Sequence, residues 1–375
     1  MSEKPTSPVL AEAGHPGVRV LTVRCGAVGE AYITIPAQAG DEPASLFQRL
    51  YSYIDEAPEW RVIRQDVFGT VRVPEKGMKS YRLDGAEWPA TWVEAGHGQA
   101  SPLAGVHAHA LSGVRVHPLR LNQRLVGVWY EDEYARHAIL TGIRPTSPNG
   151  SRPAQAQEAL LMMEQGLAMA GMTFRDVYRT WFYLEDILEW YGEFNVVRNR
   201  FFKERGIYEG LVPASTGVGG VNSGGTALVA DLMAVVPKSK AMTVRAVPSP
   251  LQCPALEYGS SFSRAVETSV PGQRKLTISG TASIAPEGHT IHVGDVRKQI
   301  ELTMDVVLAI LRSRGMDWKD TTRAIGYFRH AADMPLFAEY CAANKLPDMP
   351  AVISLNDVCR DDLLFELELD ATVLG

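Results

Sequence analysis

The stretch GMTFRDVYRTWFY, residues 171–183, returns in pattern as GMDWKDTTRAIGYF, residues 315–328. Both copies begin with Gly-Met and continue with an aromatic residue, a basic residue and Asp. The two copies align without a gap at least as far as Arg179 and Arg323, which occupy the same position in each. A repeat of this length is typical of a duplicated domain rather than of a short solenoid unit.

The sequence around each copy repeats as well. A helical pattern precedes each copy, and before each helix lies a strand pattern that ends in glycine, at Gly142 and Gly280. A second helical pattern, a Pro-Ala pair (213–214 and 350–351) and a last strand pattern follow. The hydrophobic period therefore switches between about 3.6 and 2, which predicts a layered unit of strand, helix, strand, helix and strand.

The N-terminal third follows this order less clearly. Residues 18–36 have a hairpin pattern, residues 42–57 a helical pattern, and residues 59–69 a strand pattern resembling the one after Gly171. A third, eroded copy of the unit is left open. We predict a flexible N-terminus, an N-terminal domain that is a candidate degenerate unit, a first clear unit, a proline-rich linker and a C-terminal unit, at residues 1–15, 16–120, 121–237, 238–257 and 258–375.

The composition is that of an ordinary globular protein. The chain has 375 residues, of which 46% are hydrophobic and 21% charged, and a net charge of −6. These values argue against nucleic acid as a partner, since such proteins carry a basic patch or stripe. The four cysteines are scattered without a CxxC pair, and no apolar run reaches the roughly 18 residues of a membrane span. Because the N-terminus lacks a signal-peptide pattern, we expect a cytoplasmic protein with no membrane partner; a homo-oligomer is left open.

The last strand pattern carries a row of acids. In FELELD, residues 365–370, hydrophobic residues alternate with acids, among them Glu366 and Glu368. Alternate residues of a strand point to opposite faces. The acidic row is therefore either a solvated face of an edge strand or a place where one carboxylate takes part in a reaction.

Five motifs carry a resemblance to a known superfamily. They are RTWFY (179–183), WYGEFNVVR (190–198), PASTGVG (213–219), SGTASI (279–284) and VCRDDLLFELE (358–368). In this order they resemble the Rid (YjgF/UK114) superfamily, and more closely its chorismatase branch. The resemblance implies an α+β fold of tandem Rid/YjgF-like (chorismate-mutase-like) units with mixed sheets and helices on one face. It also implies an intrachain pseudo-trimer with a site between units.

The chain departs from both family patterns. Chorismatases tend to carry Trp-Asn-Tyr where this chain has Phe182 between Trp181 and Tyr183. Rid deaminases carry an arginine after the Pro-Ala pair to hold the substrate carboxylate, and this chain has Ser215 and Val352 there. The missing arginine argues against Rid-type imine deamination, and Phe182 leaves strict chorismatase activity open.

The resemblance implies a catalytic acid at Glu366. In chorismatases the matching glutamate is held to protonate the enolpyruvyl methylene of chorismate, after which water or the ring hydroxyl captures the oxocarbenium ion and pyruvate leaves. A glutamic acid can do this near pH 7 if burial and a second carboxylate, here Glu368, raise its pKa. The implied protein is a chorismatase-like lyase or hydrolase that forms a hydroxybenzoate or a dihydroxycyclohexadiene carboxylate. An enamine or imine deaminase and a non-catalytic binder of a small acidic metabolite remain alternatives.

A carboxylate substrate needs cations and amides around the acid. Arginine binds carboxylates with two parallel hydrogen bonds. Arg198 shares a helical face with Tyr191, where it either lies along apolar surface or reaches into a cleft. Small residues in a loop before a strand let backbone amides approach an anion. We therefore expect the substrate-binding residues to be Arg198, Tyr191, Ser215, Thr216, Gly217, Ser279, Gly280, Arg179, Arg329, Cys359 and Arg360.

No metal or cofactor is expected. His107 and His109 have ligand spacing on one strand face, but no third ligand clusters with them in the sequence. The sequence contains no GxGxxG, Walker or GxSxG motif. The predicted partner is therefore a small-molecule carboxylate alone.

Overall fold

The computed structural model of the chain describes residues 17–38, 40–41, 43–69, 88–95 and 103–375. The strands form three mixed sheets, one of five strands and two of six. Helices pack against these sheets, so the expected α+β class is confirmed.

The first sheet belongs to the N-terminal third. Its unit consists of β1 (Arg19–Cys25), β2 (Val28–Pro36), α1 (Pro43–Glu56), β3 (Arg61–Phe68), β4 (Ala90–Val93) and β5 (Gly105–Ser112). The strand order is β1-β2-β5-β3-β4.

The second unit holds the first copy of the repeated stretch. It consists of β6 (Val116–Leu121), β7 (Arg124–Glu131), β8 (Ala135–Ile143), α3 (Arg152–Met169), β9 (Val177–Leu184), α4 (Ile187–Glu204), β10 (Ala214–Gly219) and β11 (Leu228–Pro237), with short 3-10 turns η1 (Phe174–Asp176) and η2 (Ile207–Glu209). The strand order is β10-β9-β11-β8-β7-β6.

The third unit holds the second copy. It consists of β12 (Thr243–Val247), β13 (Ala265–Val270), β14 (Gln273–Ala282), α5 (Val296–Ser313), β15 (Thr321–Phe328), α6 (Pro335–Ala343), β16 (Ala351–Leu355) and β17 (Phe365–Leu374), with 3-10 turns η3 (Ala255–Tyr258), η4 (Trp318–Asp320) and η5 (Ala331–Asp333). The strand order is β12-β13-β14-β17-β15-β16.

All three sheets share one topology. Each has a parallel pair at one edge, formed by β3 with β4, β9 with β10, and β15 with β16. In each, the last strand of the unit, β5, β11 or β17, pairs antiparallel with the inner member of that pair. The N-terminal third therefore has the same strand arrangement as the other two units.

The repeated stretch forms the turn that links the first helix of a unit to the next strand. Gly171 and Gly315 adopt φ of 67° and 68°, the left-handed conformation that glycine tolerates after a helix. The Asp176 carboxylate then accepts a hydrogen bond from the Thr173 backbone N–H at 2.7 Å. Asp320 accepts the equivalent bond at 2.8 Å. The repeat is thus a capped turn, which explains its Gly and Asp residues.

Two edge strands cross the predicted bounds of the units to which they belong. β12 lies inside residues 238–257, the segment predicted to be a linker, and pairs with β13. β6 lies before residue 121, the predicted start of its unit, and pairs with β7. Most residues of β12 are exposed and most of β6 are half-buried or exposed, so neither shows the hydrophobic alternation of a buried strand.

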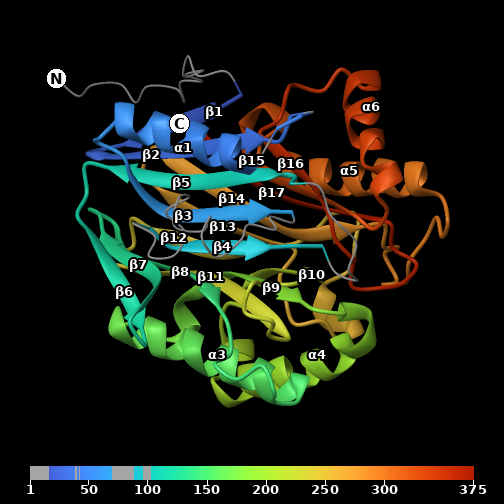
Figure 1. Cartoon of the computed structure of the whole chain (residues 1–375), viewed down its shortest axis with the longest axis horizontal. Coiled ribbons are helices and arrows are strands. Elements are labelled where there is room, and N and C mark those ends of the chain that lie inside the picture. Colours follow the sequence, from blue (N-terminus) through green and yellow to red (C-terminus); the bar gives the residue numbers. More distant parts are fainter. Residues whose placement is uncertain (1–16, 39, 42, 70–87, 96–102) are drawn as a thin grey trace.

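The three units close around a common axis. The parallel edge of each unit lies against the sheet of another unit: β4 against β8, β10 against β14, and β16 against β2. At the centre, the Phe68 ring lies 6.2 Å from the ring of Tyr183 and 6.2 Å from that of Tyr327, on corresponding strands. The helices α1, α3 with α4, and α5 with α6 lie on three outer sides (Figure 1). The expected intrachain pseudo-trimer is confirmed.

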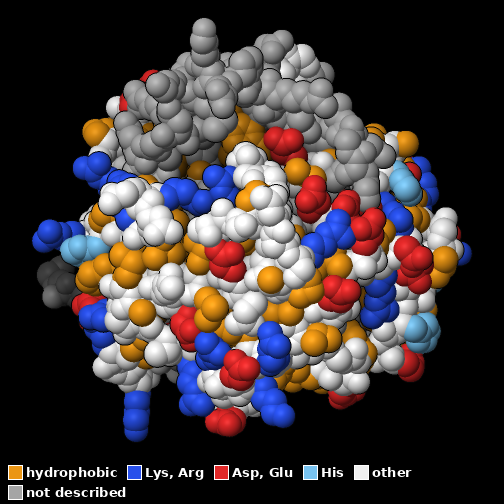
Figure 2. Space-filling view, turned by 60° about the horizontal axis from the view of Figure 1, so that its bottom comes forward, with side chains coloured by type: hydrophobic (Ala, Val, Ile, Leu, Met, Phe, Trp, Pro, Cys, Tyr) orange, Lys and Arg blue, Asp and Glu red, His pale blue; other side chains and the backbone are white. Residues whose placement is uncertain are grey.

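The surface carries charges of both signs. On the face shown in Figure 2, Lys and Arg side chains are interspersed with Asp and Glu and form no stripe. None of the helices in the described ranges is long and apolar enough to span a membrane.

Candidate active site

The acidic row of the last strand is buried. Glu366 and Glu368 are 4% and 0% exposed, because β17 lies between β14 and β15 in the interior of its sheet. The alternating residues Phe365, Leu367 and Leu369 belong to the hydrophobic core under α5. The reading of this row as the solvated face of an edge strand is therefore wrong.

Glu368 is held ionised by a network that crosses between units. Its carboxylate accepts hydrogen bonds from Arg179 Nη2 at 2.8 Å and from the indole Nε1 of Trp181 at 2.9 Å. It also pairs with Arg323 Nη1 at 2.7 Å. Burial alone would raise the pKa of Glu368, but the two guanidinium groups outweigh it and lower the pKa to about 2.

This network is part of a ring around the axis. Each unit supplies one arginine and one carboxylate: Arg64 with Asp66, Arg179 with Asp231, and Arg323 with Glu368. Asp66 lies 2.9 Å from Arg64 and 3.4 Å from Arg323, and Asp231 lies 3.5 Å from Arg64. Asp370 also lies 3.5 Å from Arg323 Nη1, so the carboxylates already outnumber the three arginines, and a further ionised carboxylate would add to the negative excess.

Glu366 is that further carboxyl group. It lies two residues before Glu368 on the same strand face, at the boundary between the second and third units. Its carboxyl contacts Gly280, and the Gly280 N–H donates to Thr216 Oγ1 at 3.0 Å. Burial, followed by the charge of Glu368, raises the pKa of Glu366 to about 8, although Arg179 opposes the rise. Glu366 is therefore mostly protonated at pH 7, while Glu368 is ionised. Acid catalysis can use such a pair, in which one carboxyl group keeps its proton and the other carries the negative charge.

Helix α4 contributes Arg198 and Tyr191 from the second unit. Arg198 is 1% exposed, and its Nη2 donates to Asn195 Oδ1 at 2.8 Å. Its Nε is buried and has no hydrogen-bond partner among the described residues. Burial raises the pKa of Tyr191, and both Arg198 and Glu366 act on it electrostatically. A buried guanidinium with an unused N–H donor is suited to an incoming carboxylate, and Tyr191 and Cys359 each lie within electrostatic reach of both Arg198 and Glu366.

The chain just before β17 forms another wall. Burial, followed by the charge of Glu366, raises the pKa of the Cys359 thiol to about 12, so this cysteine is no thiolate nucleophile. The Arg360 guanidinium lies 5.6 Å from the Tyr258 ring centroid. Cys359 therefore offers an apolar surface, with a cation and an aromatic ring beside it.

The residues Ser215, Thr216 and Gly217 lie in β10 and not in a loop as predicted. They pair in parallel with β9, because the strand already begins at Ala214, the second residue of the Pro-Ala pair. The Ser215 N–H donates to Ser279 Oγ at 2.9 Å. The amides of Ser215 and Gly280 therefore join β10 to β14 instead of facing an anion.

Comparisons with known proteins agree with this geometry. No protein-family model matches the chain. Over 216 residues it is 31% identical to a chorismatase of Streptomyces rapamycinicus, covering 51% of this chain and 62% of that protein's length. Over 256 residues it is 30% identical to a chorismatase of Streptomyces hygroscopicus, covering 62% of this chain and 71% of that protein. The chain belongs to the chorismatase family.

Two further similarities concern product and fold. This chorismatase-family chain is 27% identical over 284 residues to a 3-hydroxybenzoate synthase of Streptomyces hygroscopicus, covering 64% of this chain and 79% of that protein. A crystal structure of a chorismatase aligns with a TM-score of 0.62 and 22% identity, covering 83% of this chain and 92% of the solved chain. This alignment shows the same fold.

Two of the predicted substrate-binding arginines of this chorismatase-family chain make structural contacts next to the site. Arg179 is 0% exposed and belongs to the charged ring, where its Nη2 also donates to Thr216 Oγ1 at 2.7 Å. Arg329 donates through Nη1 to the Asp361 carbonyl, and its Nε lies 3.6 Å from Asp357 Oδ1. The contacts of Arg329 therefore hold the segment that carries Cys359.

Sequence reasoning missed Tyr258 and Arg264. The Arg264 guanidinium lies 5.5 Å from the Tyr258 ring centroid and donates to the Cys253 carbonyl. Burial raises the pKa of Tyr258, and Arg264 and then Cys359 act on it electrostatically. Tyr258 and Arg264 were missed because Tyr258 directly follows the segment predicted to be a linker. The sequence signal that could have indicated them is a tyrosine and an arginine close together just after that segment.

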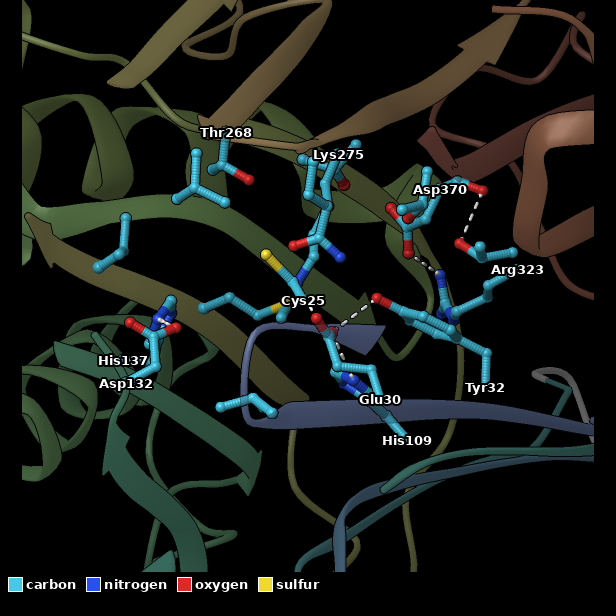
Figure 3. A pocket seen from close by; sticks show the side chains of 18 of the residues that line it. Cys25, Glu30, Tyr32, His109, Asp132, His137, Thr268, Lys275, Arg323 and Asp370 are labelled. Atoms are coloured by element: carbon cyan, nitrogen blue, oxygen red, sulfur yellow. Dashed lines mark hydrogen bonds and ion pairs between the residues drawn. The ribbon is translucent and has the colours of Figure 1, made fainter. Parts of the chain in front are cut away.

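A separate cavity of about 170 Å³ lies between the three sheets (Figure 3). Its charged groups pair with one another: Glu30 with Lys275 and with His109 at 3.1 Å, and Asp132 with His137 at 2.9 Å. Glu366 does not line it. In the part of the chain that the structure describes, no group of three or more His, Cys, Asp or Glu side chains could hold a metal ion.

Proposed function

We propose that this chorismatase-family protein releases pyruvate from chorismate, or from a closely related enol ether, by acid catalysis without a cofactor. The observation that carries the proposal is the buried Glu366 carboxyl, which has a pKa of about 8 and lies in one cluster with Arg198. The relatives named chorismatase and 3-hydroxybenzoate synthase support the same substrate class.

Glu366 acts as the general acid. Its proton passes to the methylene carbon of the enolpyruvyl group, which leaves an oxocarbenium ion and the Glu366 carboxylate. The negative charges of Glu366 and Glu368 then stabilise the cation in a site of low polarity. The Glu366 carboxylate regains its proton when the cation is captured.

Two captures are chemically balanced. Addition of water forms a hemiketal, which breaks down into pyruvate and a dihydroxycyclohexadiene carboxylate. Capture by the ring hydroxyl forms a cyclic ketal. Loss of the ring proton next to the ether oxygen then breaks the bond between the ring and the captured oxygen, which makes the ring aromatic, and the resulting hemiketal breaks down into pyruvate and a hydroxybenzoate with no net consumption of water. The buried thiol of Cys359 and the Tyr258 ring border the position of the substrate ring, and Arg198 binds a substrate carboxylate through Nε and Nη.

The test is to mix the purified full chain with chorismate and measure pyruvate through a coupled lactate dehydrogenase reaction. We expect pyruvate from the wild type, none from Glu366→Gln, and an unchanged rate from Glu301→Gln, which alters an exposed glutamate of α5. Chromatography of the second product distinguishes a hydroxybenzoate from a dihydroxycyclohexadiene acid. Absence of pyruvate from the folded wild type would overturn the proposal.

The setting of the enzyme is proposed as well. Four free cysteines support a reducing compartment, and we propose the cytoplasm. Because one chain already supplies all three units around the axis, the Glu366 site needs no second copy of the chain. Light scattering of the purified protein decides whether the homo-oligomer that the sequence leaves open forms in solution.

A further inference from the structure

A second boundary between units repeats the geometry found next to Glu366. At the boundary of the second and third units, the Gly280 N–H donates to Thr216 Oγ1 at 3.0 Å. At the boundary of the first and second units, the Gly142 N–H donates to Thr91 Oγ1 at 2.7 Å. The threonines lie on the corresponding edge strands β10 and β4, and the glycines on the corresponding strands β14 and β8. The pseudo-threefold axis therefore relates the two boundaries.

The side chain beside the glycine differs between them. At Gly280 it is the Glu366 carboxyl, whereas a Cβ added to Gly142 would lie 3.7 Å from Arg124 Nη2. On β11, the position that corresponds to Glu366 is Val229, as the pairing with the neighbouring strand shows. The Gly142 N–H also donates to Asp231 Oδ1 at 2.8 Å, but the first boundary has no acid at the position of Glu366 and has the Arg124 guanidinium near its glycine.

Arg124 and Arg144 both line a cavity of about 300 Å³ whose lining residues all belong to the second unit. Their hydrogen-bond partners are neutral: Arg124 donates to the Gly142 carbonyl, and Arg144 Nη1 donates to Ser223 Oγ at 3.0 Å. Burial, followed by the charge of Arg144, lowers the pKa of Arg124 to about 10, and burial lowers the pKa of Arg144. No carboxylate of the described residues pairs with either one. Two partly buried positive charges without a counter-charge favour an anion between them.

We propose that this cavity is a second binding site, for a small carboxylate with an apolar body. The guanidinium groups bind the carboxylate, and the apolar body lies on the apolar part of the wall. Its apolar residues are Leu121, Val126, Pro145, Pro148 and Met162, and its polar ones are Asn122, Thr146 and Thr226. An inorganic anion would leave the apolar residues uncovered, so the wall favours an organic acid such as benzoate over phosphate. Because none of the lining residues is an acid, the ligand binds here without reacting.

The test follows binding at the site itself. The full chain is labelled with [methyl-13C]methionine, the Met162 signal is assigned with Met162→Leu, and benzoate is titrated by NMR. We expect a saturable shift of the Met162 signal. Arg124→Gln and Arg144→Gln should each weaken benzoate binding at least tenfold. Arg120→Gln, which alters an exposed arginine of the same hairpin, should leave it unchanged.

Further readings separate this site from the Glu366 site and define the ligand class. Both arginine variants should keep their melting temperature within a few degrees and their pyruvate release within about twofold. Phosphate should bind at least tenfold more weakly than benzoate. An unmoved Met162 signal, or benzoate binding that survives in both folded variants, would overturn the site, and equal binding of phosphate would overturn the ligand class. Since the titration reads binding, it does not depend on whether the chain turns over chorismate.

Discussion

Replacing Gly280 with alanine tests the position of the Glu366 carboxyl. The backbone of Gly280 does not have a positive φ, so alanine introduces no backbone strain. Its Cβ would overlap Glu366 Oε1 and would lie 2.8 Å from the carboxyl carbon, where ordinary contacts begin near 3.4 Å. Thr216 Cγ2, at 3.2 Å, limits movement of the new methyl group on its other side. The carboxyl must therefore move by roughly 1 Å, a displacement that can cost about 100-fold in rate.

We expect Gly280→Ala to lower kcat for pyruvate release by about two orders of magnitude. KM should change little, because Arg198 is untouched. The coupled assay is run at saturating chorismate, with a thermal melt of each variant. Gly192→Ala is the control: it adds the same methyl group on α4, where nothing lies within 4 Å, and should stabilise the helix by about 1 kcal/mol without changing kcat. A folded Gly280→Ala protein with wild-type kcat would refute the assignment of Glu366 as the acid.

Further predictions concern charge and binding. The kcat/KM of the wild type should fall about tenfold per pH unit above pH 8, as Glu366 loses its proton. Glu368→Gln should shift this fall to lower pH by about one to two units, since it removes a charge that raises the pKa and leaves Arg179 unopposed; an unshifted profile would contradict the coupling. The raised pKa of Glu366 means that its contribution to stability is complete below pH 4.5 and is lost as the pH rises through about 8. Glu366→Gln should therefore unfold at a higher temperature than the wild type at pH 9, by an equivalent on the order of a few kcal/mol, and an equal melting temperature would count against burial of the charge. Arg198→Gln should raise KM for chorismate about 10- to 100-fold, as expected for a lost charge-assisted hydrogen bond; an unchanged KM would place the carboxylate elsewhere.

The two clear units could be predicted because their turns keep the same chemistry. Gly171 and Gly315 end helices in the left-handed conformation, and an Asp caps the turn that follows each. The first unit has the same strand order without that motif, so only the likeness of residues 59–69 pointed to it. Arg64 on β3 occupies the place of Arg179 and was overlooked for the same reason.

The burial of Glu366 could not be predicted from β17 alone. Alternation shows that the acids share a face, but it does not show whether that face meets water or another sheet. Glu368 finds its partner Arg179 in a different unit, so the decisive contacts join residues far apart in the chain. The same limit hid the pairing of Ser215 with Ser279 across the boundary.

The covalent connection of the three units has a consequence for how such a site can diverge. In a ring of three identical chains, every substitution is made three times, so an acid placed at the Glu366 position would be buried at all three boundaries. Each such burial is unfavourable by several kcal/mol if the group ionises. Within a single chain the boundaries mutate independently. Glu366 and Val229 can therefore differ at corresponding positions. Only one boundary is destabilised by a buried acid, and the other two contribute to stability.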